Sequence, residues 1–98
     1  MTVKEFMEAH IDEVIPFLPR PYFSSRDFIW EVMRLAERDY IELLHTCDAE
    51  RPIQAIHAQI GKFLAKHADS YNISKLDEKE PSNSPFGTPS ETQKWEFA

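Results

Sequence analysis

Residues 51–71, RPIQAIHAQIGKFLAKHADSY, constrain the fold of this chain more than any other stretch. Pro52 suits the first turn of a helix, because its missing N–H would have no intrahelical partner there in any case. Apolar positions then recur at helical spacing on one face, namely Ile53, Ile56, Ile60, Phe63, Leu64 and the aromatic His67. The pattern predicts an amphipathic helix whose apolar side must be covered. The other elements of a small domain of 98 residues therefore have to pack around it.

The opposite face of this helix carries small residues, amides and ammonium groups: Gln54, Ala55, Ala58, Gly61, Lys62, Ala65 and Lys66. Between Pro52 and Ala68 the chain has no Asp or Glu. Glycine inside a helix costs roughly 0.5–1 kcal/mol relative to alanine, so some neighbour is expected to need the space beside Gly61. Two interpretations stay open. Either another helix of the domain packs on the small residues, or the face approaches the floor of a DNA major groove.

An N-terminal helix is predicted over residues 3–15, where apolar residues form a stripe. Thr2 and Glu5 have the spacing of a capping box, in which each side chain bonds the backbone N–H of the other residue. Pro16 is expected in the closing turn of this helix, and Pro19 and Pro21 then favour an extended connection. In that connection Tyr22 and Phe23 are expected to fill the core.

One long helix is predicted over residues 24–47, as the spine of the core. Ser24 opens it with an acidic residue three positions later, and apolar residues cover an arc of about 160–180°. Asp39 projects within that arc, so the helix either breaks near it or gives it a partner. Trp30 and Ile41 lie at the edge of the polar side, where they would meet the N-terminal helix or a partner chain. A two-fold homodimer is therefore expected.

The C-terminal part of the chain predicts a β-hairpin. Residues 71–76 lose the helical period, residues 93–97 alternate polar and apolar, and the loop between them contains PSNSPFGTPS. The predicted fold is mainly α with a C-terminal β-hairpin, with three main helices and two short strands in one domain, 1–98. Its parts are an N-terminal helix with a proline-rich connection (1–19), a helical core (24–71) and a hairpin with a wing-like loop (72–98). The residues expected in the core are Phe28, Leu35, Leu43, Ile56, Ile60, Phe63 and Trp95.

This order of elements, with helices ahead of a central helix and a hairpin behind it, resembles the winged helix-turn-helix fold. The resemblance covers residues 24–97 and leaves helix 3–15 as an N-terminal addition. It implies that PIQAIHAQIGKFLAKHA is the recognition helix, which enters the major groove, and that EPSNSPFGTPSETQ is a wing that touches the DNA backbone or minor groove. The wing departs from that pattern because its flanks are acidic, with Asp77, Glu78, Glu80 and Glu91 opposed only by Lys79 and Lys94.

The expected function is binding of nucleic acid, with duplex DNA as the partner. The expected contacts are Arg51, Gln54, His57, Lys62 and Lys66. The two lysines would meet phosphates, which carry little sequence information, whereas Gln54 could read a base edge. Residues 48–76 form the only segment with net positive charge, +1, from four basic and three acidic residues.

An alternative stays open beside this expectation. The whole chain has a net charge of −6, which favours an acidic protein–protein interaction module on the same fold, without nucleic acid. Its interface would be the acidic wing together with helix 3–15.

Other classes of function find no support in the sequence. No catalytic motif is present. Because the chain has only two glycines, it cannot form a glycine-rich phosphate loop. Neither an enzyme nor a cofactor is therefore expected. His67 lies inside an apolar face, which favours a core histidine over a metal ligand, and Cys47 has no CxxC partner. One cysteine and no long apolar run indicate a cytoplasmic protein without a membrane span.

Overall fold

The computed structural model describes residues 1–83, 86–87 and 89–98, with only the backbone for Pro89. The elements in chain order are α1 (Val3–Val14), the 3₁₀ turn η1 (Ile15–Phe17), β1 (Tyr22–Ser24), α2 (Ser25–Leu35), α3 (Glu37–His45), α4 (Pro52–His67), the 3₁₀ turn η2 (Ala68–Tyr71), β2 (Ile73–Asn83) and β3 (Pro89–Phe97). Within these ranges the fold is mixed α/β, with four α-helices and an antiparallel sheet of three strands in the order β1-β3-β2. The predicted helices and hairpin are present, but the prediction lacked one strand and gave α2 and α3 as one helix, with a break near Asp39 as one of two alternatives.

The N-terminal helix α1 is an integral part of the core. Its capping box forms as expected, because the Glu5 N–H donates to Thr2 Oγ1 at 3.1 Å and the Thr2 N–H donates to Glu5 Oε1 at 2.9 Å. The apolar stripe of α1 is buried, with Phe6 and Val14 fully inaccessible. Although this helix lies outside the winged-helix resemblance, it covers the core, and its removal would uncover the core.

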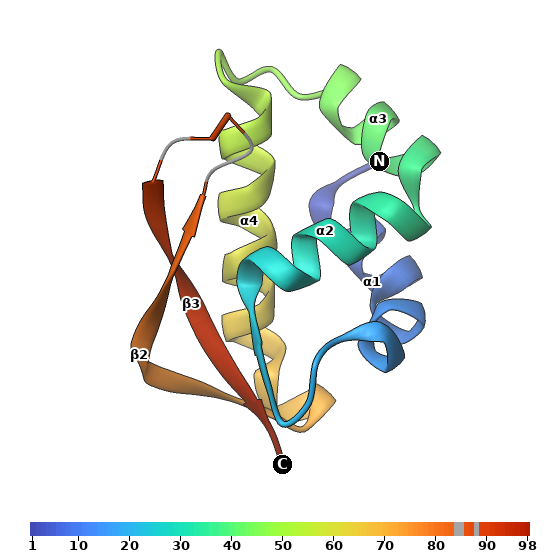
Figure 1. Ribbon diagram of the computed structural model, residues 1–98. Helices are drawn as coiled ribbons and strands as arrows, with labels where there is room; N and C mark the ends of the chain where they lie inside the picture. The colour runs from blue at the N-terminus through green and yellow to red at the C-terminus, as the bar shows by residue number, and fades with distance from the viewer. Residues whose placement is uncertain (84–85, 88) are drawn as a thin grey trace.

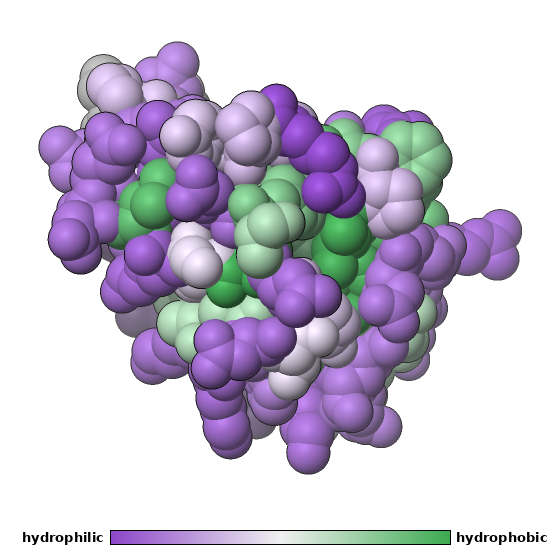
Figure 2. All heavy atoms as spheres, turned by 90° about the horizontal axis from the view of Figure 1, so that it is seen from below, coloured by the Kyte–Doolittle hydropathy of each residue, from purple (hydrophilic) through white to green (hydrophobic). Residues whose placement is uncertain are grey.

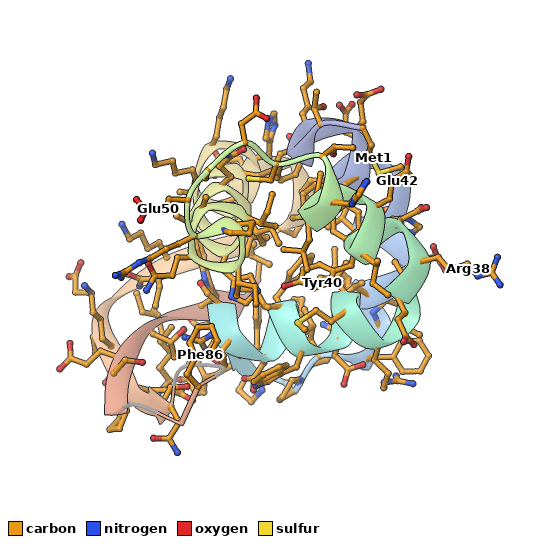
Figure 3. All side chains as sticks on the ribbon, turned by 90° about the horizontal axis from the view of Figure 1, so that it is seen from above. Met1, Arg38, Tyr40, Glu42, Glu50 and Phe86 are labelled. Atoms are coloured by element: carbon orange, nitrogen blue, oxygen red, sulfur yellow. The ribbon has the colours of Figure 1, made fainter. Side chains whose placement is uncertain are left out.

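The helix predicted over residues 24–47 is broken at Ala36, which leaves the helical region at φ −125° and ψ 46°. The break separates α2 from α3 and turns the chain (Figure 1). Asp39 also has a partner, because its Oδ2 lies 2.7 Å from His10 Nε2 on α1. Both outcomes expected for this carboxylate thus occur together. Tyr40 of α3 lies between the helices, while Arg38 points away from the body of the molecule (Figure 3).

The strand β1 was not predicted, because three residues are too short for an alternating pattern to show. It pairs with β3 and places Phe23 opposite Trp95, with the two rings stacked at 6.5 Å between centroids. Ser24 ends β1 and caps α2, since its Oγ accepts the Asp27 N–H at 3.0 Å. The indole N–H of Trp95 donates to Ser25 Oγ at 2.9 Å, which fixes the start of α2 against the last strand.

The hairpin strands are longer than the predicted strands at 71–76 and 93–97, and residues 84, 85 and 88 of the expected loop lie outside the described residues. A bulge interrupts the pairing between Lys75 and Lys79 of β2. The side-chain amide of Gln93 fills it by donating to the Leu76 carbonyl at 2.5 Å and to the Lys94 carbonyl at 3.0 Å. The Gln93 amide therefore satisfies backbone carbonyls that the interrupted strand pairing would otherwise leave without a donor.

The helix α4 runs through the middle of the molecule, with the hairpin along one side and the other helices along the other (Figure 1). The residues expected in the core are buried except Leu35, which is half-buried near the break, and Tyr22, which is exposed beside the buried Phe23. The face in Figure 2 is largely polar, with apolar side chains in separate small patches. None of the helices in the described ranges has the length and apolar content that a membrane span requires.

Candidate nucleic-acid interface

The outward face of α4 is open to solvent. Apolar residues at Ile56, Ile60 and Leu64 are buried, whereas Gln54, Ala58, Gln59, Lys62, Ala65 and Lys66 are exposed. A Cβ added to Gly61 would have no described atom within 4 Å. The interpretation that another helix of the domain packs on these small residues was therefore wrong. The glycine is not needed for packing inside the described part of the chain.

A groove of about 280 Å³ separates α4 from the hairpin. On the helix side it is lined by Ala58, Gly61 and Ala65, whose short side chains leave the space open. On the strand side it is lined by Gln93 and Trp95. Two lysines, Lys62 of α4 and Lys75 of β2, also border it. The small residues thus create a channel with ammonium groups beside it.

A second groove, of about 240 Å³, lies between α1 and α4. Its polar lining comes from Lys4, Gln59, Lys62, Lys66 and His67. Its apolar lining is Val3 and Phe63, and the Phe63 ring packs against the His67 ring at 4.3 Å between centroids. His67 is thus half-buried at the groove edge rather than fully enclosed in the core.

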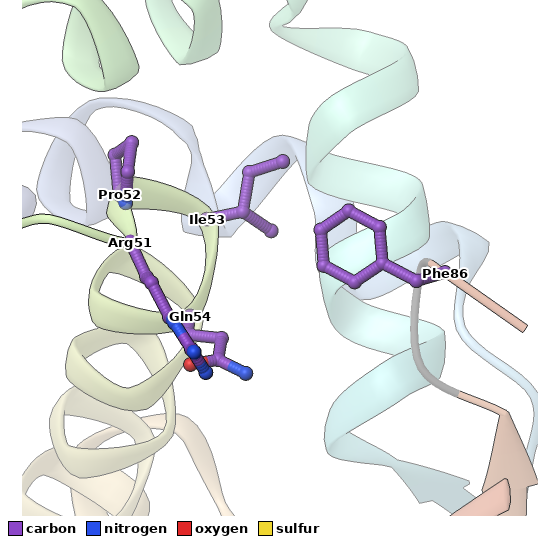
Figure 4. Close-up of a pocket in the computed structure, with 5 residues that line it drawn as sticks. All are labelled: Arg51, Pro52, Ile53, Gln54 and Phe86. Carbon is purple, nitrogen blue, oxygen red and sulfur yellow. The ribbon is translucent and has the colours of Figure 1, made fainter. Parts of the chain in front are cut away.

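A third pocket, of about 400 Å³, lies where the hairpin tip meets the first turn of α4, and its lining residues are Arg51, Pro52, Ile53, Gln54 and Phe86. Ile53 and Phe86 face one another across it, while the side chains of Arg51 and Gln54 extend side by side (Figure 4). Pro52 begins the helix as predicted, and Arg51 precedes it at the N-cap without a capping side-chain hydrogen bond. The tip of the hairpin and the start of α4 therefore share one end of the molecule.

His57 does not lie with the other predicted contact residues. Its side chain is half-buried, and its Nε2 is 2.8 Å from the hydroxyl of Tyr40 on α3. Burial and the positive charge of Arg26 lower the pKa of His57 to about 4, so the ring is neutral at pH 7. A neutral, hydrogen-bonded imidazole between two helices is suited to positioning α4 rather than to contacting a phosphate.

The charges around α4 separate by sign. Lys4, Lys62, Lys66 and Lys75 are exposed, and none of them forms an ion pair with another described residue. The hairpin carries exposed acidic groups instead, and one of them, Glu78, lies 3.5 Å from Lys94 Nζ. Lys94 is further engaged over the Tyr22 ring at 4.7 Å. These lysines thus lie around α4: on the helix itself, in the first turn of α1 and at the start of β2. The rest of α1 exposes the carboxylates of Glu5, Glu8, Asp12 and Glu13.

The structure brings four of the five predicted contact residues to the surface of α4. Arg51 and Gln54 lie at the hairpin end of the helix, and Lys62 and Lys66 lie along the groove to α1. The sequence analysis did not include Lys4 or Lys75, because they belong to other elements and join the site only through the fold. Among the residues that the structure describes, no group of three His, Cys, Asp or Glu side chains is placed to hold a metal ion.

Comparison with protein-family models, with curated proteins and with solved structures finds no match to this chain. The function is therefore inferred from the geometry and charge of the chain itself.

Proposed function

We propose that this protein binds nucleic acid, with duplex DNA as the partner, through the outward face of α4. In this proposal the fold is a winged helix, α4 is its recognition helix and the β2–β3 hairpin is its wing. The proposal includes α1, whose buried stripe belongs to the same core. It also accommodates the break at Ala36, which adds α3 ahead of α4.

The observation that supports the proposal best is an exposed helix face without carboxylates in a chain of net charge −6. A helix with its side chains is about 10–12 Å wide, and the major groove of B-DNA is about 12 Å wide. Small side chains at Ala58, Gly61 and Ala65 allow the helix backbone to come close to base edges. Lysines beside the face supply the charge that phosphates require.

Each contact residue has a role that follows from its chemistry. Lys62 and Lys66 bind phosphates as flexible point charges and set affinity rather than sequence preference. Gln54 presents a carboxamide, which can bond an adenine edge through both its donor and its acceptor. Arg51 at the start of the helix binds a phosphate or a guanine edge. His57 acts through its hydrogen bond to Tyr40, which holds α4 against α3.

The proposal is tested by fluorescence anisotropy with a labelled duplex at low salt. Non-specific binding by such proteins has Kd values of about 10⁻⁴–10⁻⁶ M, so protein concentrations up to tens of micromolar are sufficient. Lys62→Ala and Lys66→Ala should weaken binding about equally across DNA sequences. Arg38→Ala, which removes an exposed cation from α3, is the matched control and should bind as the wild type does.

The Gln54→Ala variant separates sequence reading from charge. Loss of a base contact should reduce discrimination between sites by ~1–3 kcal/mol and should leave the salt dependence unchanged. The proposal fails if the wild-type protein binds neither duplex nor single-stranded DNA or RNA under these conditions.

A second candidate function is supported by the acidic hairpin and by exposed aromatic residues. Phe17 is 57% exposed and Trp30 is 45% exposed, and the Arg34 guanidinium lies 5.4 Å from the centre of the Phe17 ring. Such side chains favour a protein partner. Of the interface first expected for this alternative, α1 now offers only its polar outer side, because its apolar stripe is buried.

A further inference from the structure

Three ammonium groups from two helices border the groove between α1 and α4. Lys62 and Lys66 come from α4, and Lys4 comes from α1. All three side chains are exposed, and none pairs with a carboxylate among the described residues. This concentration of positive charge stands out in a chain with 17 acidic and 11 basic residues.

The arrangement has a cost that folding alone does not explain. Like charges four residues apart on a helix, as at Lys62 and Lys66, destabilise it by about 0.2–0.5 kcal/mol. Lys66 lies in the last turn of α4, where the helix dipole favours a cation. Lys62 lies outside that turn, and Lys4 lies in the first turn of α1, where the dipole disfavours a cation. The helix dipole thus stabilises only Lys66 of the three lysines: Lys62 gains nothing from it, and Lys4 is disfavoured by it.

The groove has the form that an extended chain of negative charges requires. Val3 and Phe63 line its floor, and Gln59 adds an amide donor beside the ammonium groups. Lys62 and Lys66 are spaced about 6 Å apart along the helix axis. A nucleic-acid strand carries one phosphate for about every 3.4 Å of duplex axis, so neighbouring lysines can reach different phosphates of one strand.

We propose that this groove holds the phosphodiester backbone of one nucleic-acid strand, and that Lys4 is a phosphate contact supplied by α1. The inference rests on the proposed function, because two of its three lysines belong to α4. A helix in a major groove has a strand on each side. The strand on the α1 side is held by Lys4 and Lys66, with Lys62 between this groove and the hairpin groove.

The test compares the salt dependence of duplex binding in three variants with that of the wild type. Lys4→Met removes the ammonium and keeps an apolar stem of similar length over the groove. The slope of log affinity against log salt concentration should become shallower by roughly 0.9, which corresponds to one phosphate contact. Lys4→Arg should restore the wild-type slope because it keeps the charge. Arg38→Met makes the same charge change on α3, outside the groove, and should leave the slope unchanged.

The possible failures are distinguishable. If the wild type binds duplex DNA and Lys4→Met has the wild-type slope, the groove does not hold the backbone, although the proposed function stands. If Arg38→Met flattens the slope as much as Lys4→Met, the effect follows net charge and the inference is overturned. If polyglutamate displaces the duplex equally well at equal charge concentration, the groove selects acidic chains in general and the inference is again overturned. If the wild type binds no nucleic acid, the proposed function and this inference both fail.

Discussion

The imidazole of His10 on α1 joins the carboxylate of Asp39 on α3, with 2.7 Å between Nε2 and Oδ2. The other ring nitrogen lies 3.0 Å from Glu13 Oε1. Burial disfavours the charged ring, but hydrogen bonds to Glu13 and Asp39 outweigh this effect and raise the pKa of His10 above its ordinary value. The pair links two helices that are far apart in sequence.

This link predicts a contribution to stability that depends on pH. Because the pKa of His10 is raised in the folded protein, its contribution is fully present below the unfolded pKa of about 6.5 and is lost as pH rises through the folded pKa. Asp39→Asn should lower the free energy of unfolding by about 1 kcal/mol at pH 5 and by less at pH 8. Urea denaturation at the two pH values measures this. An equal loss at both would show that the charged ring is not involved.

His57 should have the opposite pH dependence. Its pKa falls to about 4 in the folded protein because of burial and the charge of Arg26. Its contribution is present above the unfolded pKa of about 6.5 and is lost between there and pH 4, by at most about 3 kcal/mol. A His57→Gln variant has no imidazole to protonate, so its free energy of unfolding should fall less than that of the wild type over this pH range. Denaturation curves across the range measure the difference. A variant with the same acid sensitivity as the wild type would contradict the assignment.

Removal of the Tyr40 hydroxyl should destabilise the protein. Tyr40→Phe leaves the half-buried His57 ring without its hydrogen-bond partner, at a cost of about 1–3 kcal/mol. The ring of residue 40 stays in the core, so any loss follows the hydroxyl rather than packing. Thermal unfolding of Tyr40→Phe at pH 7 measures the effect, and an unchanged midpoint would mean that the hydrogen bond is not important to the fold.

Two residues of α3 provide a matched test of the core. Leu43 is 2% exposed and Ile41 is 55% exposed. Leu43→Ala should cost about 2–5 kcal/mol because it empties a packed site. Ile41→Ala should change stability by no more than about 0.5 kcal/mol. Similar losses in the two variants would show that the faces of α3 are assigned incorrectly.

Gly61 allows folding and binding to be separated. Because an added Cβ meets no described atom within 4 Å, Gly61→Ala and Gly61→Leu should keep the fold. Both should gain roughly 0.5–1 kcal/mol from helix propensity. Only the leucine should obstruct close approach, so DNA affinity should fall in Gly61→Leu and persist in Gly61→Ala. A Gly61→Leu protein that keeps wild-type affinity would place the ligand elsewhere.

The exposed Trp30, with Ile41, also predicts a two-fold dimer. Sedimentation at about 100 µM, where even weak dimers with Kd near 100 µM (about −5.5 kcal/mol) are populated, should show an average mass above the 11.5 kDa of the chain that rises toward twice this value with concentration. Trp30→Ala should shift the protein toward the monomer. A wild type that sediments only as a monomer would exclude this idea.

The parts of the fold that sequence reasoning found are those specified by neighbouring residues. Thr2 with Glu5 and Ser24 with Asp27 form their capping boxes as their spacing predicted, because each partner is three residues away. The apolar face of α4 is buried for the same reason of local periodicity. Caps and periodic faces depend little on the rest of the chain.

The features that were missed depend on distant residues. A break near Asp39 was one of two expected outcomes, but its place at Ala36 follows no glycine or proline; it occurs where α3 turns to bring Asp39 to His10. The strand β1 exists only through its pairing with β3. Likewise, Lys4 joins the lysines of α4 because α1 packs beside that helix. Charges on separate elements have no shared spacing by which the sequence could reveal their proximity.

The last strand of the chain, β3, is also the middle strand of the sheet. Neither β1 nor β2 has another strand to pair with in the described structure, so the sheet depends wholly on β3. The partners Phe23 and Trp95 are about 70 residues apart in sequence, so their pairing closes a very long loop. Such non-local contacts form slowly, whereas the helices form from local contacts. We therefore expect the helices to form early in folding and the apolar side of α2 to stay uncovered until the C-terminal strand docks.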